Sequence, residues 1–130
     1  MVLIVKNNIM NFNDYNWHDA VIKNIKIDRG NPGINDIIVF DIEWPDEEGK
    51  VTFVFEEVYW AEMKLNFGIV ADETILNSIE LDNDNQDLYN FYSKWNGAMN
   101  ELKLKTYKIE LNSTGGEIKI IAKTFSIDKK

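Results

Sequence analysis

The stretch DIIVFDIEWPDEEGKVTFVF, residues 36–55, decides the fold class. Apolar and polar residues alternate before and after Pro45–Gly49, a segment rich in turn-forming residues. Such alternation on both sides of a turn predicts a β-hairpin with one buried face. The face expected to be buried on the first strand comprises Ile38, Phe40, Ile42 and Trp44, with Asp41 and Glu43 opposite, and the second strand contributes Val51, Phe53 and Phe55.

Outward from this hairpin, the same logic predicts further strands. Ala20–Asp28 reads as a strand that leads into a dense turn at residues 28–33, so a three-strand meander is expected. Val58–Phe67 alternates as another strand would, although a short helix over Glu56–Leu65 also fits its pattern. Thr74–Leu81 is a further expected strand.

The second half of the chain predicts one helix and a closing hairpin. Asp84–Asn96 has helical periodicity, with Asp84 as the expected N-cap and Gly97 as terminator. Its apolar stripe is formed by Leu88, Phe91, Tyr92 and Trp95, at i, i+3, i+4 and i+7, and should lie on the sheet. Leu102–Leu111 and Glu117–Ile127 flank a Gly-containing turn and predict the hairpin. The expected class is therefore α+β, a mostly antiparallel hairpin meander with one main helix packed on it, in a single domain over residues 1–130 with residues 1–14 as a peripheral strand or arm.

Composition narrows the functional classes. The chain has 130 residues, 45% of them hydrophobic, and no cysteine, which removes disulfides, thiolate nucleophiles and sulfur-ligated zinc. Met1–Val5 is apolar but ends at Lys6, too short for a secretory signal, and no run reaches the length of a membrane span. We therefore expect a cytoplasmic protein with no membrane partner. A net charge of −8 opposes binding to nucleic acid.

Trp17, His18 and Asp19 form the only histidine-containing motif. A histidine beside a carboxylate is the pattern of an oriented general base. Adjacent residues of an extended chain point to opposite sides, however, so we expect no hydrogen bond between the two side chains and favour a structural histidine or turn cap. No serine lies in a nucleophile elbow, and Asp82–Asp87 lacks the calcium-loop pattern. The sequence predicts no catalytic residue, metal or cofactor.

Charge is concentrated in one segment. Residues 36–62 hold nine acids and one base, whereas the remainder holds thirteen residues of each sign. Acids interleaved with Trp and Tyr are typical of a docking surface for a basic protein; a solvated face and protection of a sheet edge explain the acids equally well. The residues predicted to bind a partner are Asp41, Glu43, Trp44, Asp46, Glu47, Glu48, Glu56, Tyr59 and Trp60.

Four short motifs are Tyr15–Ala20, Ile25–Arg29, Phe53–Glu56 and Asn112–Gly116. With them the chain resembles a group of small bacterial α+β domains, the immunity proteins of polymorphic-toxin systems. The resemblance implies an inhibitor that binds a cognate toxin domain in the cytoplasm, without catalysis or cofactor. Many toxin domains carry basic clefts, and an acidic inhibitor would gain association rate from long-range attraction.

Two other functions remain open from the sequence. A small-ligand-binding or enzymatic domain would have a pocket near Trp17 and His18, with a carboxylate in reach of the histidine. A structural or oligomeric scaffold would instead expose an apolar patch. The discriminating feature is the geometry around His18.

Overall fold

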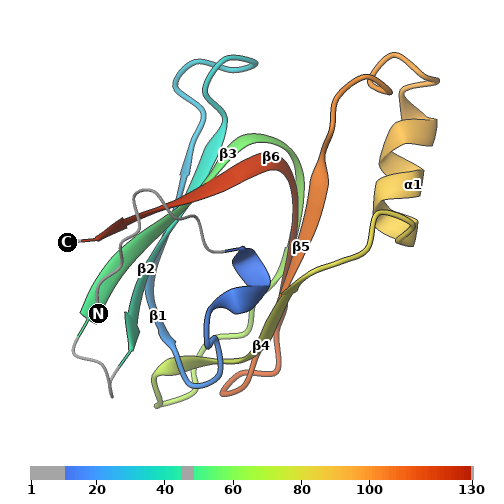
Figure 1. The fold of residues 1–130 in the computed structure, drawn as a ribbon. Coiled ribbons are helices and arrows are strands. Elements are labelled where there is room, and N and C mark those ends of the chain that lie inside the picture. Colours follow the sequence, from blue (N-terminus) through green and yellow to red (C-terminus); the bar gives the residue numbers. More distant parts are fainter. Residues whose placement is uncertain (1–10, 45–48, 130) are drawn as a thin grey trace.

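The computed structural model describes residues 11–44 and 49–129. Within them the chain forms a 3₁₀ turn, six strands and one helix (Figure 1). The elements are η1 (Phe12–Asp14), β1 (Val21–Asp28), β2 (Ile37–Trp44), β3 (Gly49–Lys64), β4 (Glu73–Glu80), α1 (Gln86–Lys94), β5 (Lys105–Leu111) and β6 (Glu117–Lys129). The expected antiparallel sheet with one helix is confirmed. The sheet is more than a meander, however, because it closes into a barrel in the order β1-β2-β3-β6-β5-β4.

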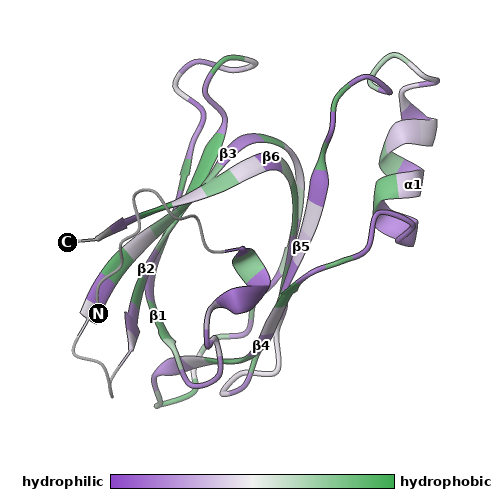
Figure 2. Ribbon diagram, viewed as in Figure 1, coloured by the Kyte–Doolittle hydropathy of each residue, from purple (hydrophilic) through white to green (hydrophobic). Residues whose placement is uncertain are grey.

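Alternation along the strands positions the core as the sequence predicts. In β2 every second side chain is buried, and Phe40 pairs in register with Phe53. Paired residues of antiparallel strands face the same side, so these rings meet inside the barrel. Figure 2 shows hydrophobic and hydrophilic residues following each other along the strands. The main core joins the inner faces of all six strands.

β3 is a single long strand, and the alternative of a helix over Glu56–Leu65 is wrong. It bends where Glu57 adopts a positive φ of 53° and where a bulge shifts the register between Val58 and Trp60. A bulge adds one residue and increases the local bend. Before the bend β3 pairs with both β2 and β6; after it β3 pairs with β6 alone.

The N-terminal part of the described chain fills one side of the barrel. Phe12 is fully buried, and its ring lies against Phe55 and Tyr107 with centroids 5.9 and 4.8 Å apart. The Trp17 indole donates to the Phe12 carbonyl at 2.8 Å. Phe12 therefore belongs to the core, whereas Asn13 and Asp14 are exposed; residues 1–10 of the expected peripheral arm lie outside the described part of the chain.

Helix α1 lies beside the barrel on its outer face (Figure 1). Leu88 and Phe91 are buried with Leu104 and Ile121 in a second, smaller cluster. The N-cap is Asn85, whose side chain accepts from the Leu88 amide at 2.9 Å, so the expected capping by Asp84 is wrong. Trp95 follows the helix and is 45% exposed, which removes it from the packed stripe. Among the described residues, no helix is long and apolar enough to cross a membrane.

Candidate functional site

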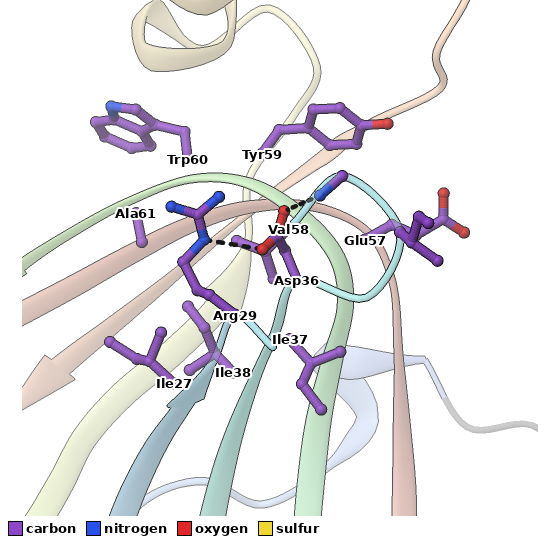
Figure 3. A pocket seen from close by; sticks show the side chains of 12 residues that line it. Ile27, Arg29, Asp36, Ile37, Ile38, Glu57, Val58, Tyr59, Trp60 and Ala61 are labelled. Carbon is purple, nitrogen blue, oxygen red and sulfur yellow. Dashed lines mark hydrogen bonds and ion pairs between the residues drawn. The ribbon is translucent and has the colours of Figure 1, made fainter. Parts of the chain in front are cut away.

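A groove of about 430 Å³ opens between the β1–β2 loop and the bend of β3. Figure 3 shows it from close by. On one side, Ile27 at the end of β1 faces inward, because it pairs with the buried Ile38. On the other side lies β3 from Glu57 to Ala61. Ile27 and Ile34 are 56% and 74% exposed, so the groove has an apolar lining that nothing in the described chain covers.

One ion pair organises the mouth of the groove. Arg29 Nε donates to Asp36 Oδ1 at 2.8 Å, and the Gly33 amide donates to Asp36 Oδ2 at 3.0 Å. These hydrogen bonds, that of Arg29 first, hold the pKa of Asp36 below its ordinary value. Because Nε takes the Asp36 contact, the terminal nitrogens of Arg29 remain directed towards β3, where Trp60 and Ala61 lie (Figure 3).

The acids of residues 36–62 do not form one unpaired acidic face. Four of the described ones lie within 4.0 Å of a cation from outside that segment, and all of these pairs except Arg29–Asp36 join residues at least 20 positions apart. The pairs are Asp36 with Arg29, Glu43 with Lys23, Glu57 with Lys123, and Glu62 with Lys119. Asp41 accepts from Thr52 and Asn24, and Glu56 accepts from Thr124. The predicted residues Asp46, Glu47 and Glu48 lie outside the described residues.

The three aromatic residues of the predicted docking surface have different environments. Trp44 is only 9% exposed and donates its indole N–H to the Asn16 carbonyl at 2.6 Å, so it is a core residue and unavailable as a surface anchor. Trp60 is half-buried against the cluster beneath α1. Tyr59 is 37% exposed and packs edge-on against Phe91, with ring centroids 6.1 Å apart. Only Tyr59 and Trp60 therefore reach the groove.

His18 and Asp19 lie in an exposed turn. Their side chains are 61% and 69% exposed, and His18 Nδ1 is 3.3 Å from Asp19 Oδ2. The expectation that they would point apart is wrong, because Asp19 has a positive φ of 70° and the chain there is not extended. Trp17 is buried, and neither it nor His18 lines the groove. The groove is therefore not the pocket expected near Trp17 and His18.

Residues that sequence reasoning missed are Ile27, Arg29 and Ile34. A usable signal was present, because Ile34 is an apolar residue in the middle of an Asn-, Pro- and Gly-rich turn. Such turns lie on the surface, so an apolar side chain there is expected to be exposed and available for binding. A second hollow, about 480 Å³, lies beside α1 and is lined by Tyr89, Tyr92 and loop residues. No group of three His, Cys, Asp or Glu side chains in the described ranges could hold a metal ion.

The groove combines an apolar lining with one ion pair at its mouth. Arg29 and Asp36 pair with each other, Glu57 lies 4.0 Å from Lys123, and most of the remaining lining is apolar. Such a lining suits hydrophobic contact with a few oriented hydrogen bonds. Comparison with protein-family models, with curated proteins and with solved structures finds no match.

Proposed function

We propose that this chain is a non-catalytic binding protein, an immunity-type inhibitor that binds and neutralises a cognate bacterial toxin in the cytoplasm. The observation that supports binding is the uncovered apolar groove between the β1–β2 loop and β3. The immunity character is supported by the resemblance of the motifs around Trp17–Ala20 and Phe53–Glu56. The partner would be a protein with a basic surface.

The interface of this proposal differs from the one expected from the sequence. Trp44 is buried and contributes to stability instead. The groove adds Ile27, Ile34 and Arg29 to Tyr59 and Trp60. Apolar and aromatic side chains at the centre of an interface supply most of its binding energy, so these residues would anchor the toxin.

The acidic residues would act mainly on the rate of association. The whole chain carries −8, which attracts a basic partner over long range. Glu43, Glu57 and Glu62 already have lysine neighbours, which reduces what each would gain from direct contact with a basic partner. Removing one of these acids should therefore slow association without much effect on dissociation.

The test is co-expression with the toxin encoded beside the gene, followed by binding kinetics on an immobilised surface. Ile34→Glu should weaken binding by about ten-fold or more, because it places a charge in the apolar groove. Val70→Glu is the matched control, since Val70 is fully exposed in a loop away from the groove.

Three outcomes distinguish the alternatives. Absence of both binding and toxin neutralisation removes the immunity proposal. Binding that both variants leave unchanged keeps the inhibitor but moves the interface off the groove. Association that slows as salt rises from 0.1 to 1 M, where the Debye length falls from about 10 to 3 Å, supports electrostatic steering.

A second candidate function is the binding of a small carboxylate ligand in the same groove. Its volume of about 430 Å³ falls in the range of small-molecule pockets, and the terminal nitrogens of Arg29 suit a carboxylate. Arg29→Lys would lose the bidentate geometry, whereas Arg29→Met would also lose the charge. Thermal stabilisation by a panel of small carboxylates that Arg29→Met abolishes would favour this candidate over the inhibitor.

A further inference from the structure

The edge of β3 beside the groove lacks a partner strand among the described residues. The pairing of β2 with β3 ends at Ile37 and Glu56. Beyond that point, the Val58 amide donates to the Asp36 carbonyl at 3.0 Å, Tyr59 lies at the bulge, and residues 60–64 pair only with β6 on the opposite edge. In a strand, successive backbone N–H and C=O groups point to alternate edges. This part of β3 therefore presents backbone donors and acceptors towards the groove.

The side chains that flank this edge are apolar on the face turned towards the barrel interior. Ala61 and Met63 pair with the buried Ile120 and Ile118, so all four share that face. Ala61 is exposed nonetheless, and Ile27 is exposed across the groove. Elsewhere in the barrel, the chain covers its own interior with Phe12 and Trp17 of the N-terminal segment. No described segment does the same here.

The charges around the groove are already opposed. Arg29 is paired with Asp36 at 2.8 Å, and Glu57 lies 4.0 Å from Lys123. Glu62 is on the outer face and does not line the groove; its neighbour Lys119, at 3.6 Å, is shared with Asp87 and Glu117. The lining thus has little excess charge, and its open hydrogen-bonding groups are those of a strand edge and the terminal nitrogens of Arg29. A neutral, extended polypeptide complements both.

We propose that the groove binds an extended segment of the protein partner, which adds to the barrel as a β-strand along residues 59–64. The segment would carry apolar side chains at alternate positions, so that they enter the groove beside Ile27 and Ala61. Terminal nitrogens of Arg29 would donate to its backbone carbonyls or to a polar side chain. This inference rests on the proposed function in requiring a protein partner, and it specifies how that partner binds.

A second copy of the chain is the less favoured occupant. Two copies would each contribute a charge of −8, which opposes their association at low salt. An extended segment can also form hydrogen bonds with the backbone groups at the edge of β3 without requiring two curved barrels to meet. Sedimentation that shows dimers, abolished by a change in the groove, would overturn the proposal in favour of self-association.

The experiment uses a phage-displayed library of short random peptides, selected on the immobilised full chain. We expect enriched peptides with alternating apolar residues. A synthetic peptide of this kind is then added until it saturates the protein. The exchange rate of backbone amides within residues 59–64 should fall by about ten-fold or more, because new hydrogen bonds protect them. Peptide affinity should change little between 0.1 and 1 M salt, since the groove is neutral.

Two variants make the test specific. Ala61→Arg fills the groove from an exposed position and should abolish peptide binding. Leu76→Arg is the matched control, because Leu76 is 46% exposed on β4 away from the groove. Failure to enrich any peptide, or binding that Ala61→Arg leaves intact, would overturn strand addition. If the toxin still binds and is neutralised in that case, the inhibitor function stands and only its mode of binding is wrong.

Discussion

At the scale of single residues, Trp17 and His18 show how neighbours in one motif can have opposite roles. The Trp17 ring lies 4.7 Å from both Phe12 and Phe53, measured between centroids, and its N–H is bonded inside the core. His18 extends into solvent beside Asp19. The motif is therefore a structural tryptophan followed by an exposed turn, and its conspicuous histidine contributes little to the core.

We expect Trp17→Ala to lower the free energy of unfolding by about 3–5 kcal/mol, because it removes a large buried ring and leaves the Phe12 carbonyl without its donor. His18→Ala should change it by no more than about 0.5 kcal/mol. Urea denaturation followed by tryptophan fluorescence of the remaining indoles measures both. A large loss for His18→Ala would show that the turn has a stabilising role that its exposure does not reveal.

A second residue-scale prediction concerns the buried phenol of Tyr107. Burial, and secondarily the charge of Glu80, raises its pKa well above the ordinary value of 10. The folded protein thus holds the proton more tightly than the unfolded chain, so the stabilisation is complete below pH 10 and is lost as pH rises above it. The free energy of unfolding should fall by about 1.4 kcal/mol per pH unit from this group.

Tyr107→Phe should remove this contribution and flatten the alkaline dependence by about that amount. Tyr89→Phe is the control, because Tyr89 is 65% exposed. Denaturation curves collected at several pH values above 10 give the slopes. Equal slopes in wild type and Tyr107→Phe would mean that the phenol is as accessible in the folded state as in the unfolded one.

At the scale of elements, the N-terminus of α1 separates two neighbouring polar residues. Asn85 accepts from the Leu88 amide at 2.9 Å and also donates to the Asp82 carbonyl at 2.7 Å, whereas Asp84 is exposed and lies before the cap. Asn85→Ala should cost about 1 kcal/mol of stability, and Asp84→Ala should cost much less. Thermal denaturation of the two variants compares them directly; the reverse order would place the cap at Asp84.

The bend of β3 is the element that creates the groove, and Glu57 holds it. A non-glycine residue at a positive φ is strained by about 1–2 kcal/mol. Glu57→Val should therefore destabilise the protein, because a β-branched residue tolerates this conformation worst, while Glu57→Gly should be close to neutral. Glu57→Ala separates backbone strain from loss of the contact with Lys123. Equal stability of the Gly and Val variants would argue against a strained bend.

At the scale of the whole molecule, the contact that closes the barrel, between β1 and β4, has the fewest paired residues of any two neighbouring strands. β1 and β4 pair only at Val21 with Thr74 and at Ile22 with Glu73, and the Asp19 and Ile75 amides extend the contact by one bond each. β3 and β6 instead pair along most of their length. We expect the Asp19 and Ile75 amides to exchange faster than those of Phe53 and Ile120 in native-state hydrogen exchange. Uniform protection would indicate that the barrel opens only by global unfolding.

Much of the fold could be predicted from the sequence. Strand alternation is a local property, so the buried face of β2, the C-terminal hairpin and the helix stripe of Leu88 and Phe91 followed from side-chain periodicity and turn residues. Each of these depends on neighbours within a few residues, and the sequence by itself determined them.

Tertiary structure alone decided barrel closure, the burial of Phe12 and the position of the groove. These features depend on which distant segments meet. Lys23 lies beside Glu43 and Lys123 beside Glu57, although the acids of residues 36–62 form a charge cluster in the sequence. The unpaired edge of β3 likewise arises because β2 ends while β3 bends away from it. Pairing between strands, and hence the surface that remains unpaired, is a long-range property that no local pattern specifies.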